Sequence, residues 1–168
     1  MVERKEYLEQ LIGWKEEQVI KVVTGIRRCG KSTLLMQYQA WLRENGALDA
    51  QIVSVNFEEL EYEELLDYKK LYAYLKETTY IFLDEIQKVP DFEKVVDSLY
   101  VKPNVDIYIT GSNAYLLSGD LATLLTGRYV EIRMLPLSFQ EFLAITELDA
   151  ERGLAEYLRN SLLKDRKS

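Results

Sequence analysis

The stretch from Val19 to Leu35 reads VIKVVTGIRRCGKSTLL, and the expected fold is built outward from it. Its first part, Val19 to Thr24, is rich in β-branched residues and predicts a strand. A glycine loop interrupts this pattern, and residues that favour a helix follow from Lys31. A strand, the pattern GxxxxGKS and a helix, in this order, are the context that a phosphate-binding P-loop requires.

The residue types of this loop suit phosphate binding. Gly25 and Gly30 let successive backbone N–H groups point inward, where a side chain would crowd the phosphates. The helix that begins near Lys31 adds unpaired N–H groups and the positive end of its dipole. Lys31 supplies an ammonium for the β- and γ-phosphates, and the Ser32 hydroxyl is a ligand for Mg2+. Thr33 is expected to cap or pack rather than to bind the metal.

The remaining loop residues allow more than one interpretation. Arg27 and Arg28 either contact nucleotide phosphate or a neighbouring subunit, or are simply solvated. Cys29 either fills the loop or carries a thiolate whose oxidation blocks nucleotide binding. We assign the whole loop to nucleotide binding: Gly25, Ile26, Arg27, Arg28, Cys29, Gly30, Lys31, Ser32 and Thr33.

The composition excludes several classes of protein. The chain has 168 residues, of which 48% are hydrophobic and 29% charged, as expected for one folded domain. Its formal charge of -7 disfavours nonspecific adhesion to nucleic acid or anionic lipid. No apolar run approaches the roughly 18 residues of a membrane helix, so we expect a cytoplasmic protein without membrane contact. The chain has no histidine, which excludes histidine-based catalysis and histidine-ligated metals.

A second informative stretch, YIFLDE, runs from Tyr80 to Glu85. A strand that is apolar throughout belongs in the middle of a sheet that is covered on both faces. Its end delivers two adjacent carboxylates, as in a Walker B strand. Asp84 is expected at Mg2+, and Glu85 is expected to orient and deprotonate the attacking water. Gln87 and Lys88 lie just beyond, and we assign them no role.

Two later stretches offer further candidates. The strand Val105 to Thr110 ends in Gly111-Ser112-Asn113, where Ser112 or Asn113 either hydrogen-bonds the water or γ-phosphate, as a sensor 1 residue does, or forms a simple turn and helix cap. Arg128 precedes the strand Tyr129 to Met134. Arg128 either acts as an arginine finger that reaches a neighbouring subunit's γ-phosphate or forms a salt bridge at the surface.

The order of elements predicts an α/β fold. Five strands alternate with helices, which favours a mainly parallel sheet with right-handed crossovers. A separate strand for the carboxylates implies the strand order 5-1-4-3-2 in a three-layer αβα P-loop sandwich. An acidic stretch at 58–67 is expected to be a solvated face. The expected helices are Glu3 to Leu11, Lys31 to Asn45, Tyr68 to Lys76, Asp91 to Tyr100, Leu117 to Leu125, Ser138 to Ile145 behind a capping box, and Asp149 to Ser168, which has no obvious partner in the chain.

These motifs resemble those of a bacterial and archaeal family of AAA+-like ATPases. The residues that carry the resemblance are TGIRRCGKST, FLDEIQ, TGSN and GRYVEIRMLPLSFQEF, and they span most of the chain. The resemblance implies nucleotide contacts at Gly25, Gly30 and 31–33, with Asp84 and Glu85 at Mg2+ and water. It also favours the roles of Ser112 and Arg128. It implies an ATPase core at 1–148, in which 1–18 are a lead-in, and a helical segment at 149–168 that leads to a missing C-terminal domain, nuclease-like in some descriptions.

Two functions compete on this basis. In the first, the chain binds ATP and Mg2+ and hydrolyses ATP as a switch or motor for a protein partner or a missing C-terminal domain. The alternative is a nucleotide-dependent binding module with incidental turnover. No NKxD element supports a GTPase, and no acceptor-site pattern supports a small-molecule kinase. A nucleic-acid partner is not supported by the charge, and an arginine finger acting between subunits would require a homo-oligomer.

Overall fold

The structure is a computed structural model that describes residues 4–27, 29–112, 116, 123, 125–146 and 148–162. The chain divides into two compact units. Arg4–Met134 form the larger unit, and the described residues from Leu135 onward belong to the smaller one. The division falls between Met134 and Leu135, whereas the boundary predicted from the sequence, between 148 and 149, stays a prediction.

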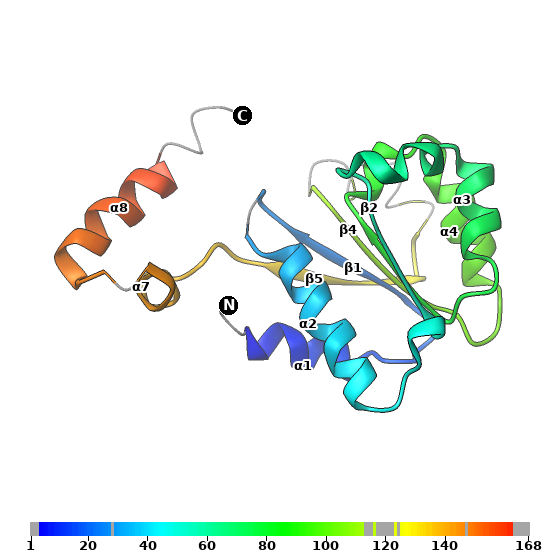
Figure 1. The fold of residues 1–168 in the computed structure, drawn as a ribbon, viewed down its shortest axis with the longest axis horizontal. Helices are drawn as coiled ribbons and strands as arrows, with labels where there is room; N and C mark the ends of the chain where they lie inside the picture. The colour runs from blue at the N-terminus through cyan, green and yellow to red at the C-terminus, as the bar shows by residue number, and fades with distance from the viewer. Residues whose placement is uncertain are drawn as a thin grey trace. The chain divides into compact units, whose positions relative to one another are not determined.

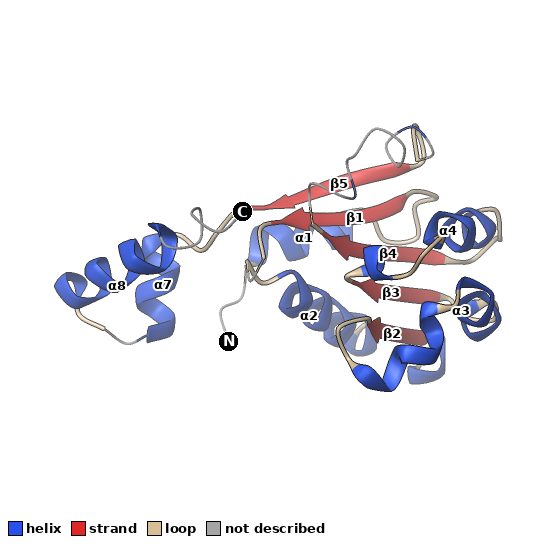
Figure 2. Cartoon of the chain, turned by 90° about the horizontal axis from the view of Figure 1, so that it is seen from above, coloured by secondary structure: helices blue, strands red, loops and turns tan. Residues whose placement is uncertain are grey.

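A five-stranded sheet is the centre of the larger unit (Figure 2). Its order is β2-β3-β4-β1-β5, and all four neighbouring pairs are parallel. Counted from the other edge, this is the predicted order 5-1-4-3-2, which is therefore confirmed. The strands are β1 (Ile20–Gly25), β2 (Ile52–Asn56), β3 (Tyr80–Asp84), β4 (Asp106–Gly111) and β5 (Tyr129–Met134).

Helices cover both faces of the sheet and make the predicted three-layer sandwich (Figure 1). Successive strand residues point to opposite faces, so Val22 joins one hydrophobic core and Val23 the other. The first core contains side chains of α3 (Tyr68–Leu75) and α4 (Phe92–Tyr100). The second contains those of α1 (Lys5–Gly13) and α2 (Lys31–Glu44). Short 3-10 helices are η1 (Asp49–Gln51), η2 (Leu60–Leu66) and η3 (Ile86–Lys88).

Most predicted elements of this unit lie within a residue or two of the observed ones. The acidic stretch contains η2, and its carboxylates are exposed, so the predicted solvated face is confirmed. Of the helix predicted at 117–125, only residues 123 and 125 are described. Among the described residues, no helix has both the length and the apolar character needed to cross a bilayer.

The smaller unit contains α7 (Phe139–Thr146) and α8 (Ala150–Leu162). The predicted capping box at its start is confirmed, since the backbone N–H of Ser138 donates to the Glu141 carboxylate and that of Glu141 donates to the Ser138 hydroxyl. We predicted no partner for the last helix, and this was wrong. The ring of Tyr157 on α8 packs edge-on against Phe139 and Phe142 of α7.

Candidate functional site

The glycine loop joins the end of β1 to the start of α2, as predicted. A Cβ atom at Gly25 would lie 2.6 Å from the Cys29 Sγ atom and 2.7 Å from the Met134 carbonyl oxygen, so only glycine fits there. Gly30 has a left-handed backbone with φ of 97° where the helix begins. Cys29 is 3% exposed and packs in the core beneath the loop. This position agrees with the first of the two roles considered for Cys29, that of filling the loop. The loop is therefore built around its two glycines and one buried thiol.

Lys31 points its ammonium back at the loop. Its Nζ atom lies 3.2 Å from the Gly25 carbonyl oxygen and 3.3 Å from that of Ile26. The side chain is 5% exposed, and the Glu85 Oε1 atom lies 3.8 Å from the Nζ atom. A buried cation is thus held by backbone oxygens and one carboxylate, all at the mouth of the loop.

A threonine of the neighbouring strand β4 bonds the Asp84 carboxylate and the backbone of Glu85. The Thr110 hydroxyl donates to the Asp84 carboxylate and accepts from the backbone N–H of Glu85 at 3.0 Å. Thr110 is fully buried, and it is a site residue that our sequence analysis did not single out. Glu85 has a left-handed backbone (φ 55°, ψ 45°), and its carboxylate accepts from the Gln87 side-chain amide. Backbone strain of this kind in a non-glycine residue often marks a functional site.

Two cavities share Ser32 at this edge of the sheet. The first, of about 350 Å³, is lined by loop residues and by two glutamates, in full Arg27, Gly30, Lys31, Ser32, Thr33, Glu58 and Glu85. The second, of about 270 Å³, lies between α2, β2 and η2 and is lined by Ser32, Leu35, Met36, Gln39, Ser54, Asn56, Glu59, Tyr62 and Asp84. Lys31, Ser32 and Glu85 therefore meet at one cavity, and Ser32 and Asp84 at the next.

These residues fit a nucleotide with Mg2+. Gly25 leaves a cradle that a Cβ would fill, and the Lys31 ammonium faces the loop. Ser32 and Asp84 line one cavity and offer the oxygen atoms that Mg2+ prefers. Glu58, which lines the first cavity, was missed by the sequence analysis. Its position after β2 was the available signal, because the carboxyl ends of parallel strands meet at one edge of a sheet.

The other predicted site residues have different surroundings. Arg27 pairs with Glu58 at 3.4 Å, and its side chain is 83% exposed. Ser112 is exposed beyond the end of β4. Arg28 and Asn113 lie outside the described residues.

Arg128 lies before the first residue of β5, and so at the opposite end of the parallel sheet from the loop. Its guanidinium donates to the Asp97 carboxylate at 2.7 Å and stacks over the Tyr100 ring. The structure thus contains the salt bridge that was one of the two alternatives for Arg128. This arginine does not reach the loop of its own chain.

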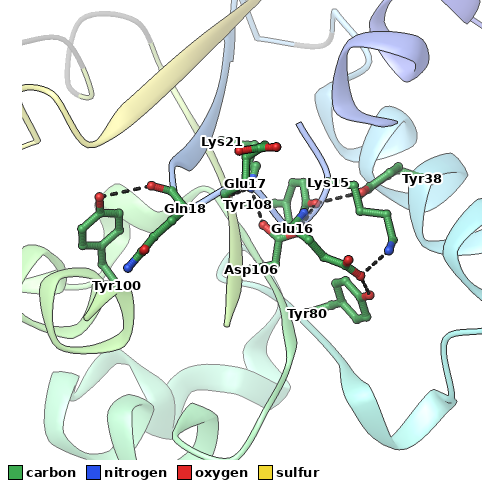
Figure 3. Close-up of polar contacts among 10 residues, drawn as sticks. All are labelled: Lys15, Glu16, Glu17, Gln18, Lys21, Tyr38, Tyr80, Tyr100, Asp106 and Tyr108. Carbon is green, nitrogen blue, oxygen red and sulfur yellow. Dashed lines mark hydrogen bonds and ion pairs between the residues drawn. The ribbon is translucent and has the colours of Figure 1, made fainter. Parts of the chain in front are cut away.

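A second polar cluster occupies that opposite end of the sheet (Figure 3). The Lys21 ammonium donates to Asp106 Oδ1 at 2.5 Å, and these side chains are 0% and 4% exposed. Asp106 Oδ2 accepts from the Tyr108 hydroxyl at 2.7 Å and from the backbone N–H of Glu16 at 2.8 Å. The Tyr38 hydroxyl lies 2.8 Å from that of Tyr108. Both carboxylate oxygens are therefore bonded, and the cluster ties β1, β4 and α2 together.

Burial governs the protonation of this cluster. It lowers the pKa of the Lys21 ammonium, an effect that the neighbouring Asp106 carboxylate opposes. It raises the pKa of the Tyr38 and Tyr108 hydroxyls, because a phenolate would lose its hydration there. The cluster thus favours neutral tyrosines beside one paired lysine.

Comparison with known proteins agrees with this geometry. Residues 17–143 match the family described as AAA domain. The chain belongs to this AAA domain family. Membership supports a nucleotide-binding, ATPase-like function at the level of the family.

Two relatives extend the comparison. An uncharacterised protein of Haemophilus influenzae is 46% identical over 165 residues, which cover 94% of this chain and 41% of the relative. An uncharacterised protein of Methanocaldococcus jannaschii is 34% identical over 150 residues, which cover 86% of this chain and 33% of the relative. The chain therefore spans less than half the length of both relatives.

Solved structures share the fold of this AAA domain. AMPPCP-bound DnaA from Aquifex aeolicus has a TM-score of 0.58 at 14% identity, over 91% of this chain and 53% of that one. The Aeropyrum pernix ORC1 protein in complex with DNA has a TM-score of 0.54 at 18% identity, and the match covers 90% of this chain and 50% of that one. Both support the assignment of the fold as an AAA+-like P-loop sandwich.

Proposed function

We propose that this AAA domain binds ATP together with Mg2+ and hydrolyses the ATP, as a switch or motor core for a partner. The observation that carries the proposal is the meeting of Lys31, Ser32 and Glu85 at one cavity, with Asp84 lining the next. A module that only binds nucleotide needs the lysine and the serine. It does not need a carboxylate at Glu85, so this residue favours hydrolysis over the alternative of a binding module.

The loop and its helix are the proposed phosphate site. Backbone N–H groups of the loop and of the first turn of α2 would bind the phosphate oxygens. The Lys31 ammonium would exchange the carbonyl oxygens of Gly25 and Ile26 for the β- and γ-phosphates. Ser32 and Asp84 would hold Mg2+, which supplies neutralisation of phosphate charge.

Glu85 is the proposed general base. Its carboxylate would orient and deprotonate the attacking water, while the Thr110 hydroxyl fixes the backbone from which Glu85 projects. Ser112 and Asn113 are proposed as sensor residues, because the strand that carries Thr110 leads directly into them. Arg27 and Arg28 are proposed as phosphate contacts from the loop.

A finger role for Arg128 would have to act on a neighbouring subunit, because this arginine lies at the opposite end of the sheet from its own loop. We also propose a partner, further domains and a cytoplasmic location. The lengths of the two relatives support further domains, since each match covers less than half of the relative. The overall charge of -7 gives no support to a nucleic-acid partner.

The test measures binding and turnover separately. Calorimetric titration with ATP and GTP, with and without Mg2+, should show magnesium-dependent ATP binding that Lys31→Ala abolishes. Phosphate release from ATP should fall by about 100-fold or more in Glu85→Gln, in line with removal of a general base, while ATP binding persists. Lys70→Ala and Glu64→Gln are matched controls, because they alter an exposed lysine and glutamate that pair with each other at 3.8 Å. Unchanged release in Glu85→Gln would favour the binding module.

A further inference from the structure

The side chain of Gln87 contacts Glu85, the proposed general base. Gln87 lies in η3, and its Nε2 atom donates to the Glu85 Oε2 atom. Its Oε1 atom is buried, yet accepts no hydrogen bond from any residue that the structure describes. A buried acceptor without a partner costs free energy, so a side chain that keeps one is held in place by something else.

The space around Gln87 supports its present position. A Cβ atom at Gly111 would lie 2.5 Å from the Gln87 Oε1 atom, so the glycine at the end of β4 makes room for the amide. A rotation of the amide that exchanged Oε1 and Nε2 would set an oxygen against the Glu85 carboxylate and replace attraction with repulsion. The bond to Glu85 therefore determines the orientation of the amide.

Glu85 lies between two donors. One oxygen accepts from Gln87, and the other lies 3.8 Å from the Lys31 ammonium, beyond the range of a hydrogen bond. Among the described residues, the hydrogen bonds of this ammonium go to two carbonyl oxygens, at 3.2 and 3.3 Å. In a site of low dielectric, a carboxylate this close to a buried ammonium is strongly attracted to it. The Gln87 amide is the contact that opposes this attraction.

We infer that Gln87 is a positioning residue that keeps the Glu85 carboxylate from closing onto the Lys31 ammonium. The inference deepens the proposed function and rests on it. With Glu85 held at 3.8 Å, Lys31 can turn toward phosphate without first breaking a hydrogen bond to this carboxylate. Glu85 also stays at the mouth of the cavity, where a base acting on water is required.

A double-mutant cycle tests the inference without depending on hydrolysis. MgATP affinity is measured by calorimetry for the wild type, Gln87→Leu, Glu85→Gln and the double variant. Gln87→Leu should weaken MgATP binding about 5-fold, because Glu85 then closes onto Lys31, and the same change in the Glu85→Gln background should have no effect within error. Equal weakening in both backgrounds, or none in either, would overturn the inference. Thermal unfolding of all four proteins identifies any variant that fails to fold.

Gln87→Glu supplies a second test that a merely structural role would not affect. The introduced carboxylate cannot donate to Glu85 and should repel it toward Lys31, so MgATP binding should weaken relative to the wild type. The same change in the Glu85→Gln background should have a much smaller effect, because the neutral amide at position 85 is not driven toward Lys31. Equal weakening of MgATP binding in both backgrounds, with normal thermal unfolding, would contradict the positioning role.

The outcomes separate this inference from the proposed function. If the wild type binds MgATP but releases no phosphate, the proposed hydrolysis fails and the binding cycle still decides the role of Gln87. If the wild type binds no MgATP, the nucleotide site and the positioning role are both overturned. Where hydrolysis is measured, Gln87→Leu should lower kcat more than it raises KM, because the base is displaced as well as the lysine.

Discussion

The two ends of the sheet each hold a buried lysine beside a carboxylate, and they differ in how completely these groups are bonded. At the amino end, Lys21 donates to Asp106 at 2.5 Å, and both oxygens of Asp106 accept hydrogen bonds. At the carboxyl end, the Lys31 Nζ atom lies 3.8 Å from the Glu85 Oε1 atom and donates to two backbone carbonyl oxygens. In the first pair, both carboxylate oxygens and the ammonium have hydrogen-bond partners within the protein. The second pair leaves donors and acceptors available to a ligand.

This difference shows why similar residues have different roles in one fold. A buried ion pair whose atoms are all bonded is costly to break and fixes the strands that carry it. A buried cation held by weak contacts exchanges partners readily. We therefore expect substitutions at the amino end to change stability, and substitutions at the carboxyl end to change nucleotide chemistry.

Removal of one partner from the amino-end pair should have the largest effect. Asp106→Ala leaves the Lys21 ammonium buried without its carboxylate, so the free energy of unfolding should fall by about 3–5 kcal/mol. Urea unfolding at pH 7 measures this fall in the free energy of unfolding. Asp97→Ala is the control, because it removes the exposed partner of Arg128 and should cost less than about 1 kcal/mol.

The double variant Lys21→Met with Asp106→Leu sharpens this result. Replacing both charges removes the unpaired ammonium, so much of the lost stability should return. A double variant as unstable as Asp106→Ala would mean that packing, and not the unpaired charge, dominates at this end of the sheet.

A substitution at the carboxyl end should separate chemistry from stability. Thr110→Val deletes the hydroxyl that bonds Asp84 and the Glu85 backbone. Displacement of these two groups should slow phosphate release by roughly 30- to 100-fold. The free energy of unfolding should fall by only about 1–2 kcal/mol.

Thr78→Val is the matched control for this prediction, since Thr78 is also buried but precedes β3 at the amino end. It should leave phosphate release unchanged. Similar rates for Thr110→Val and the wild type would show that Thr110 serves the fold alone.

Alkaline pH should weaken the amino end specifically. Burial raises the pKa of the Tyr108 hydroxyl, so the folded chain keeps this proton where the unfolded chain loses it, above about pH 10. The stabilisation is complete below pH 10 and declines as the pH rises through the folded-state pKa. The lowered pKa of Lys21 acts in the opposite direction, but it is common to the wild type and Tyr108→Phe and largely cancels in their difference.

The free energy of unfolding of Tyr108→Phe should therefore decline less steeply than that of the wild type, by up to about 1.4 kcal/mol per pH unit above pH 10. Urea unfolding at pH 8, 10 and 11 measures the two slopes. Tyr74→Phe is the control, since this ring is 53% exposed. Parallel curves for the wild type and Tyr108→Phe would refute a role of this hydroxyl in alkaline unfolding.

The sequence predicted the strands and the loop that form this site better than it predicted the side-chain contacts within it. The strand order and the ends of β1 and β3 followed from hydrophobic runs and the spacing of glycines, lysine and carboxylates, which are local patterns. Thr110 and Gln87 were not assigned roles, because their partners lie on another strand or depend on side-chain orientation. The contact of α8 with α7 was missed because it depends on aromatic packing between two helices. Patterns along the chain predict the strands and the loop, whereas partners across the sheet require the fold.

Arg128→Ala should have the smallest effect and decides between the two roles considered for this arginine. The guanidinium pairs with Asp97 and its side chain is 44% exposed, so its loss should cost less than about 1 kcal/mol of unfolding free energy. Given that pairing and its place at the amino end, we expect phosphate release to match the wild type at all protein concentrations. A finger acting on a neighbouring subunit predicts the opposite, a fall of about 1,000-fold or more with ATP affinity retained. Phosphate release measured across a range of protein concentrations distinguishes them, because a finger in trans makes the wild-type rate per chain rise as subunits associate and Arg128→Ala abolishes that rise.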